Sequence, residues 1–347
     1  MKVIIASCVV PFVEGGATFL VEWLGQAIKS RGHAVETLLF PFSANYTEML
    51  DQMMALRLLD LSQHGDRLIA VRTPSYLLQH PHKILWFIHH HRPAYDLWGT
   101  RYQDIPNTPE GICYRDAIHQ ADNIAFSEAR KIFSNSRVVA ERLKQFNKVD
   151  AEVLLPPLGD PERFHCRSMG DYVLYVSRFT HHKRQWLAIE GMRHTKTPVH
   201  LVLAGKADPD SAAYVNDLRS QVEKYGLQSR VSIIDRFVSE QEKIDLFADS
   251  LAGIYFPLDE DSYGYPTLEA HHSGKPVITT SDSGGTAELI LDGVNGFLTA
   301  PDPEAIGQAM DRLYLDRAMA SAMGNSGRER IAQLNITWDN VLEKLLG

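Results

Sequence analysis

The stretch from Tyr255 to Leu298 constrains the fold of this chain more than any other. In this region two apolar strands are expected, Ala252 to Pro257 and Pro276 to Thr280, and each runs into a turn that contains glycine. A short helix is expected after the first turn, from about Pro266. In a parallel sheet the two turns would meet at one edge, where α/β folds bind phosphate because helix N-termini expose backbone amides there.

Two carboxylates accompany these glycine turns. Asp261 lies in the first turn, and Glu269 lies one helical turn into the expected helix. Phosphate favours the exposed amides, whereas carboxylate oxygens accept hydrogen bonds from hydroxyl groups. The stretch therefore predicts a site for a ligand that carries both phosphate and hydroxyl groups.

The length of the chain predicts two domains. Its 347 residues exceed the ~100–200 residues of a usual domain. Pro156 to Arg167 contains three prolines and little periodicity, which is typical of a linker. We therefore expect one domain over residues 1–160 and a second over residues 161–330.

Strand and helix patterns alternate in both halves. The strand Lys2 to Ser7 precedes an amphipathic helix from Ala17 to about Arg31, with Gly32 placed to end it. The second half begins again with a strand, Tyr172 to Ser177. The fold class is therefore α/β with parallel sheets. Leu97 to Cys113 is expected to form a long surface loop, because it is rich in Pro, Thr, Asn and Gly.

Composition excludes several classes of protein. A net charge of −8 and a pI near 6.0 argue against a nucleic-acid partner. The three widely spaced cysteines favour neither a disulfide framework nor a zinc site, so we expect a cytoplasmic protein. No apolar run reaches the ~20 residues of a membrane span, which leaves peripheral membrane contact open.

Three consecutive histidines end an apolar strand in the first half. If the strand extends through them, His89 and His91 share one face and His90 the other. A strand-end histidine can act as a hydrogen-bond or acid/base group in a cleft, or it can be purely structural. A metal site is not favoured, since no acidic or cysteine residues lie close in sequence. Asp208-Pro209-Asp210 resembles a metal-binding DxD motif, but Asp210 fits a helix cap better.

Basic residues follow the first strand of the second half. Arg178, Lys183 and Arg184 precede a helix that begins near Gln185. Positive side chains and the helix dipole would together favour an anion there, although solvated surface charge explains the same pattern. The double glycine at Gly15 and Gly16 is likewise either a ligand-binding turn or only a tight turn.

Taken in order, these motifs resemble the family 4 glycosyltransferases of the GT-B fold, and the resemblance covers nearly the whole chain. In that family a Gly-Gly follows the first strand, an Arg and a Lys five residues later open the second domain, and a G-G-x-x-E turn follows a P-V-I strand. The matching residues here are Gly15-Gly16, Arg178 and Lys183, Pro276-Val277-Ile278, and Gly284 to Glu288. The family signature also pairs two glutamates eight positions apart, and Asp261 takes the place of the first, before Glu269.

The resemblance implies a role for each matched residue. Catalytic roles would fall to His89, Arg178, Lys183 and Asp261. Arg178 and Lys183 would neutralise the diphosphate of a nucleotide sugar, and Glu269 would bind both ribose hydroxyls. The remaining substrate-binding positions would be Gly15, Gly16, His91, Gly205, Arg236, Phe237, Ser262, Tyr263, Gly264, Tyr265, Pro266, Thr267 and Leu268.

The same resemblance implies an activity. It is the transfer of a hexose, with retention of configuration, from a nucleotide-diphosphate sugar such as UDP-glucose to a saccharide or lipid-linked saccharide, without a metal or other cofactor. The last helix, within residues 331–347, would cross back to the first domain. Two alternatives stay open: another enzyme on this architecture, such as a UDP-sugar epimerase or a phosphorylase, and a non-catalytic sugar-nucleotide binder. The sequence does not define an oligomeric state.

Overall fold

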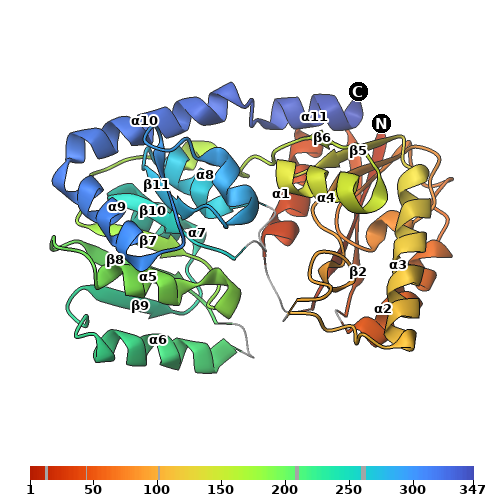
Figure 1. Ribbon diagram of the computed structural model, residues 1–347. Helices are drawn as coiled ribbons and strands as arrows, with labels where there is room; N and C mark the ends of the chain where they lie inside the picture. The colour runs from red at the N-terminus through yellow and green to blue at the C-terminus, as the bar shows by residue number, and fades with distance from the viewer. Residues whose placement is uncertain (12–14, 44, 101, 208–210, 259–262) are drawn as a thin grey trace. The chain divides into compact units, whose positions relative to one another are not determined.

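The computed structural model describes residues 1–347 except 12–14, 44, 101, 208–210 and 259–262. Contacts within the chain divide it into two compact units (Figure 1). The first unit comprises Met1–Gly159 together with Thr337–Gly347, and the second comprises Asp160–Ile336. In the described part of the chain, each unit is built on one sheet of six parallel strands.

The sheet of the first unit has the strand order β2-β1-β3-β4-β5-β6. Its strands are β1 (Lys2–Val9), β2 (Ala34–Pro41), β3 (Arg67–Ala70), β4 (Lys83–Phe87), β5 (Lys131–Ser134) and β6 (Glu152–Val153). The α-helices of this unit are α1 (Gly16–Ser30), α2 (Tyr46–Arg57), α3 (Pro109–Ser127), α4 (Arg137–Asn147) and α11 (Trp338–Leu346).

Strand β1 is apolar from Val3 to Ala6 because both of its faces are covered there. Ile4 and Ala6 belong to one buried cluster, whereas Val3 and Ile5 belong to another, together with residues of α1 and α11. Side chains alternate between the two faces of a strand, so a strand buried on both sides has no polar face. Gly32 follows α1 with φ +77°, as its expected capping position requires.

Helix α11 belongs to the first unit although it ends the chain. Val341, Leu342 and Leu345 are buried in the cluster that also contains Trp86. Trp338 Nε1 donates to the backbone oxygen of Leu158 at 2.8 Å. The expected return of the last helix to the first unit is thereby confirmed.

The sheet of the second unit has the strand order β12-β11-β10-β7-β8-β9. Its strands are β7 (Tyr172–Val176), β8 (His200–Gly205), β9 (Val231–Asp235), β10 (Ala252–Tyr255), β11 (Val277–Thr280) and β12 (Gly296–Thr299). Its α-helices are α5 (Gln185–Met192), α6 (Ala212–Lys224), α7 (Glu240–Asp249), α8 (Tyr265–His272), α9 (Pro303–Leu315) and α10 (Arg317–Gln333). The α/β fold class expected from the sequence is confirmed.

One expected loop is partly helical. Helix α3 begins at Pro109, so the prediction of a loop over Leu97 to Cys113 is wrong for residues 109–113. Thr108 caps this helix, since its side chain accepts from the backbone N–H of Gly111, and proline is favoured in the first turn. The signal was therefore present in the sequence, in a segment whose composition is otherwise typical of loops.

Candidate active site

The candidate site residues of the second unit gather around the carboxyl ends of its central strands. Strand β10 pairs with β7 on one side and with β11 on the other, all in parallel. After β7 the chain forms the short 3₁₀ helix η4 (His181–Lys183), and after β10 it leads to α8. Parallel strands end at a common edge, so segments far apart in sequence meet there.

Lys183 is held at the end of β10. Its side chain is buried, and its Nζ donates to the hydroxyl of Tyr255 at 2.9 Å. The same Nζ lies 5.4 Å from the centre of the Tyr255 ring. The Tyr175 hydroxyl donates to the backbone oxygen of Lys183 and accepts from the N–H of Phe256 at 2.9 Å. Two buried tyrosines therefore fix a cation at this edge of the sheet.

Arg184, the next residue, holds together the chain segments that follow β10 and β11. Its guanidinium donates to the backbone oxygens of Phe256 (2.6 Å) and Pro257 (3.0 Å) and to the Thr280 hydroxyl (3.0 Å). It also pairs with both carboxylate oxygens of Asp282, each at 2.7 Å. These bonds tie η4 to the ends of β10 and β11, so the donors of Arg184 serve the fold itself. Arg178, the other expected phosphate ligand, is partly buried just after β7.

Glu269 is buried on α8 and forms an ion pair. Its Oε1 accepts from Lys243 Nζ of α7 at 2.5 Å, and Lys243 also contacts Glu240 at 2.8 Å. Burial raises the pKa of Glu269, although the charge and hydrogen bond of Lys243 act in the opposite direction. Lys243 is a residue of this site that the sequence did not reveal.

The turn before α8 packs against the glycine turn after β11. A Cβ on Gly264 would lie 2.6 Å from the hydroxyl oxygen of Thr286, which belongs to the 3₁₀ helix η6 (Gly284–Leu289). Tyr263 and Tyr265 contact each other edge to face, with ring centres 5.4 Å apart. The two glycine turns therefore do meet, as the sequence predicts.

The other expected residues of this segment have different surroundings. Pro266 lies in the first turn of α8, where proline is favoured. Thr267 and Leu268 have no exposed surface, so a ligand would reach them only through their backbone or after a rearrangement. Asp261 and Ser262 lie outside the described residues.

Gly205, at the end of β8, has a packing role. Its φ is +155°, and a Cβ there would lie 1.9 Å from the backbone oxygen of Ser177. Arg236 and Phe237 follow β9 and are exposed at the surface, with Arg236 paired to Glu242 of α7 at 2.5 Å. Phenylalanine is usually buried, whereas Phe237 is 63% exposed. Its ring is therefore accessible for stacking.

In the first unit, Gly15 and Gly16 form the start of α1. Gly15 is the N-cap residue, and no side chain caps this helix. Among the described residues, none comes within 4 Å of a Cβ built on Gly15, so packing does not explain this glycine. An uncapped helix start with open space above it is suited to an anion.

The three histidines follow β4, which ends at Phe87. His90 is buried among aromatic rings, 4.2 Å from the ring centre of Tyr95, and its Nε2 contacts the Asn147 oxygen at 2.8 Å. His89 contacts the backbone oxygen of His90 through Nδ1 at 2.7 Å. Buried Nε2 of His91 has no hydrogen-bond partner in the described part of the chain. Burial lowers the pKa of all three to about 4, so they are uncharged near neutral pH.

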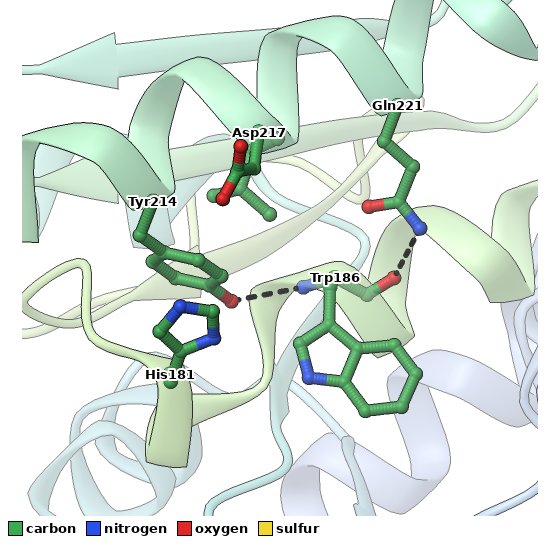
Figure 2. Close-up of a pocket in the computed structure, with 6 residues that line it drawn as sticks. His181, Trp186, Tyr214, Asp217 and Gln221 are labelled. Carbon is green, nitrogen blue, oxygen red and sulfur yellow. Dashed lines mark hydrogen bonds between the residues drawn. The ribbon is translucent and has the colours of Figure 1, made fainter.

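A surface pocket that the sequence did not reveal lies beside η4. It measures about 380 Å³ and is formed by residues of η4, α5 and α6 (Figure 2). The ring centres of His181 and Tyr214 lie 4.3 Å apart, and the Tyr214 hydroxyl accepts from the backbone N–H of Trp186 at 3.2 Å. None of the expected site residues lines this pocket.

The described residues contain neither a metal-ligand cluster nor a membrane-spanning helix. Within the described ranges, no group of three or more His, Cys, Asp or Glu side chains is arranged to hold a metal ion. Asp208 and Asp210, the possible metal motif, lie outside those ranges. No helix in the part of the chain that the structure describes is long and apolar enough to cross a membrane.

Comparison with solved structures defines the class of fold. The crystal structure of Anabaena Alr3699/HepE in complex with UDP and glucose has a TM-score of 0.70 and 17% sequence identity, and covers 99% of this chain and 98% of that one. WaaG, a glycosyltransferase involved in lipopolysaccharide biosynthesis, also has a TM-score of 0.70, with 15% identity over 99% of this chain and 100% of that one. Two parallel α/β units with this likeness define a GT-B fold.

Sequence comparison supplies the family. Residues 162–330 match the family described as "Glycosyl transferases group 1", so the second unit belongs to that family and the predicted resemblance is confirmed. Mouse α-1,3/1,6-mannosyltransferase ALG2 is 27% identical over 245 residues, which cover 63% of this chain and 58% of that protein. D-rhamnosyltransferase WbpZ of Pseudomonas aeruginosa is 28% identical over 166 residues, 47% of this chain and 41% of that protein. The chain thus spans about half the length of these relatives.

Proposed function

We propose that this protein is a retaining glycosyltransferase that moves a hexose from a nucleotide-diphosphate sugar to a saccharide or lipid-linked saccharide. The observation that carries the proposal is the placement of Lys183 and Glu269 at one sheet edge, in the unit that matches the glycosyltransferase family. A cation and a carboxylate there suit the diphosphate and the ribose of one nucleotide.

The diphosphate would bind to Lys183 and Arg178. Lys183 is fixed by Tyr255, so little reorganisation is needed when negative charge develops on the leaving group. These cations would take over the charge neutralisation that a divalent metal performs in other transferases. We therefore propose that catalysis needs no metal or other cofactor.

The nucleoside would lie between Glu269 and the exposed residues after β9. Glu269 would accept hydrogen bonds from both ribose hydroxyls, and the base would contact Arg236 and Phe237. Asp261 and the backbone amides from Ser262 to Gly264 would contact the transferred hexose. A UDP-sugar such as UDP-glucose is the proposed donor, and the likeness to a structure that contains UDP and glucose supports it.

The acceptor would be bound by the first unit, near Gly15, Gly16, His89 and His91. The lowered pKa values of these histidines mean that an uncharged imidazole would act there, as a hydrogen-bond donor or acceptor. The relatives named as mannosyl- and rhamnosyltransferases support the transfer of a sugar residue, and the saccharide acceptor is part of the proposal. A lipid-linked acceptor would bring the protein to a membrane surface without a membrane span.

A thermal-shift panel of UDP-, GDP- and ADP-sugars tests the donor, because a bound donor raises the melting temperature by mass action. The stabilising donor is then incubated with saccharide acceptors, and release of the nucleoside diphosphate is measured with and without a chelator. We expect turnover unaffected by the chelator, and a product whose anomeric configuration by NMR equals that of the donor. Binding without turnover or donor hydrolysis would favour a non-catalytic binder, and inversion of a ring carbon of the donor sugar without transfer would favour an epimerase.

A further inference from the structure

The ion pair between Lys243 and Glu269 is more deeply buried than most charged side chains are. The side chain of Glu269 is 5% exposed and that of Lys243 is 15% exposed. Charged side chains are rarely buried unless they are paired, because desolvation of an unpaired charge is costly. Either residue alone would therefore be poorly tolerated in its ionised form.

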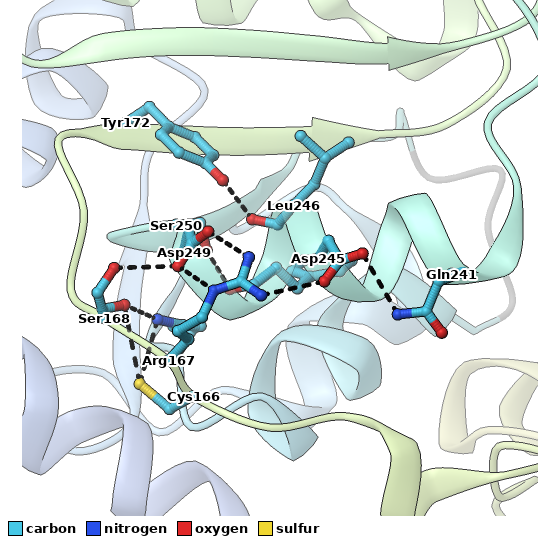
Figure 3. A network of polar contacts seen from close by, with 11 residues as sticks. Cys166, Arg167, Ser168, Tyr172, Gln241, Asp245, Leu246, Asp249 and Ser250 are labelled. Carbon is cyan, nitrogen blue, oxygen red and sulfur yellow. Dashed lines mark hydrogen bonds and ion pairs between the residues drawn. The ribbon is translucent and has the colours of Figure 1, made fainter.

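Helix α7 fixes the position of Lys243. Gln241, Asp245 and Asp249 form a stripe along one side of the helix, and Arg167 pairs with both aspartates at 3.2 and 2.5 Å (Figure 3). The hydroxyl of Tyr172, on β7, donates to the backbone oxygen of Leu246 at 2.6 Å (Figure 3).

Other residues of α7 anchor the helix in the unit. Ile244 and Phe247 are buried. These contacts hold α7 in the unit with Lys243 on the side that meets α8, where its Nζ reaches Glu269.

The charges that act on Glu269, within the described residues, come from Lys243 and Glu240 of α7. The uncharged hydroxyl of Tyr265, on α8 itself, also lies near, since the charge of Glu269 adds to the burial that raises the pKa of Tyr265. Burial acts to lower the pKa of Lys243, but the charges of Glu269 and Glu240 outweigh it and raise that pKa. Lys243 is thus a cation near neutral pH, whereas burial favours the protonated form of Glu269.

We propose that Lys243 is a positioning residue of the donor site, which keeps the Glu269 carboxylate ionised and oriented to accept both ribose hydroxyls. The inference rests on the proposed function for the role of Glu269. A carboxylate has about four acceptor positions, and Lys243 uses one oxygen, so acceptors remain for a diol. A protonated carboxyl group would instead present a donor to one hydroxyl and bind the diol more weakly.

Ribose recognition is measured by comparing UDP, GDP and ADP with their 2′-deoxy analogues by calorimetry from pH 5 to 9. The wild-type protein should prefer the ribonucleotide by about tenfold or more, since a hydrogen bond to a charged group contributes that much. In Lys243→Met the preference for the ribonucleotide should fall below about threefold at neutral pH. The acid limb of binding, which is the fall in affinity as pH drops and Glu269 becomes protonated, should move to higher pH. Lys243→Arg should restore both, because it restores the cation.

Matched measurements separate this role from a general loss of structure. Lys196→Met, at an exposed lysine of the same unit, should behave like the wild-type protein. Circular dichroism checks that each variant is folded, and Lys243→Gln replaces Lys243→Met if the latter is not. An unchanged ribose preference and acid limb in the folded Lys243 variant would overturn the proposal.

The titration of Glu269 distinguishes failure of this inference from failure of the proposed function. Its carboxyl ¹³C resonance, assigned by its loss in Glu269→Gln, should titrate at higher pH in Lys243→Met than in the wild-type protein. If the wild-type protein shows no ribose preference, the proposed role of Glu269 fails, and this titration alone decides whether Lys243 keeps the group ionised. An unshifted titration would then overturn the inference.

Discussion

Lys183 and Arg184 are adjacent cations with different expected roles, and replacing each with methionine separates them. Methionine is close in length to both side chains and carries no charge. Lys183→Met should lower kcat by about 10²–10³, the usual effect of removing one group that stabilises transition-state charge. Its melting temperature should fall less than that of Arg184→Met, because the methionine side chain keeps the apolar contact with the Tyr255 ring.

Arg184→Met should instead destabilise the protein. It removes bonds to two backbone oxygens, to Thr280 and to both oxygens of Asp282. Breaking a fully buried ion pair costs about 3–5 kcal/mol, but the Asp282 side chain is 34% exposed and water can replace part of the pair. We therefore expect a loss of about 2–4 kcal/mol, which corresponds to a fall on the order of 10 °C in melting temperature.

Calorimetry and donor-saturated turnover, measured on both variants, test the pair of predictions. At temperatures where Arg184→Met stays folded, its kcat should remain within about tenfold of the wild-type value, since its guanidinium is committed to the fold. The reasoning would be refuted by the opposite pattern, a stable Arg184 variant without activity and an active Lys183 variant. Tyr255→Phe is the matched control, because it keeps the ring and removes only the hydroxyl that Lys183 contacts.

Further predictions concern pH dependence and packing. Burial raises the pKa of Asp122 to about 7, although the hydrogen bonds from Tyr95 and Tyr76 act in the opposite direction. Ionisation of this carboxyl group therefore lowers the stability of the folded protein as pH rises from about 4 through 7. The melting temperature of Asp122→Asn, relative to that of the wild-type protein, should therefore be higher at pH 8 than at pH 4. Gly205→Ala should cost at least about 2 kcal/mol in urea unfolding, because the new Cβ meets a backbone oxygen at a φ unfavourable for alanine. Trp338→Phe should cost about 1–3 kcal/mol in the same assay, because the backbone oxygen of Leu158 loses its donor.

Much of the fold follows from local patterns in the sequence. Gly32 ends α1, as its position in the sequence predicts, because capping depends on residues within a few positions. The two glycine turns meet because parallel strands share an edge. Even the missed start of α3 had a local signal at Thr108 and Pro109.

The roles of individual side chains at the site depend on distant partners. Nothing near Lys243 in sequence points to Glu269, which lies on another helix. Arg184 looks like Lys183 in the sequence, and only the ends of β10 and β11 show that its donors are already used. The residue types of the candidate site were therefore predictable from local motifs, but the pairing of Lys243 with Glu269 and the bonds that commit Arg184 to the fold were not.

The return of α11 to the first unit imposes an order on synthesis. The apolar cluster around Trp86 includes Val341, Leu342 and Leu345, so the first unit cannot complete its core until those residues have left the ribosome. The whole second unit is translated in between, which takes roughly ten seconds or more at usual elongation rates. During that interval the nascent first unit exposes an apolar face that a chaperone can bind. The second unit, which is continuous in sequence, can fold before the first is finished.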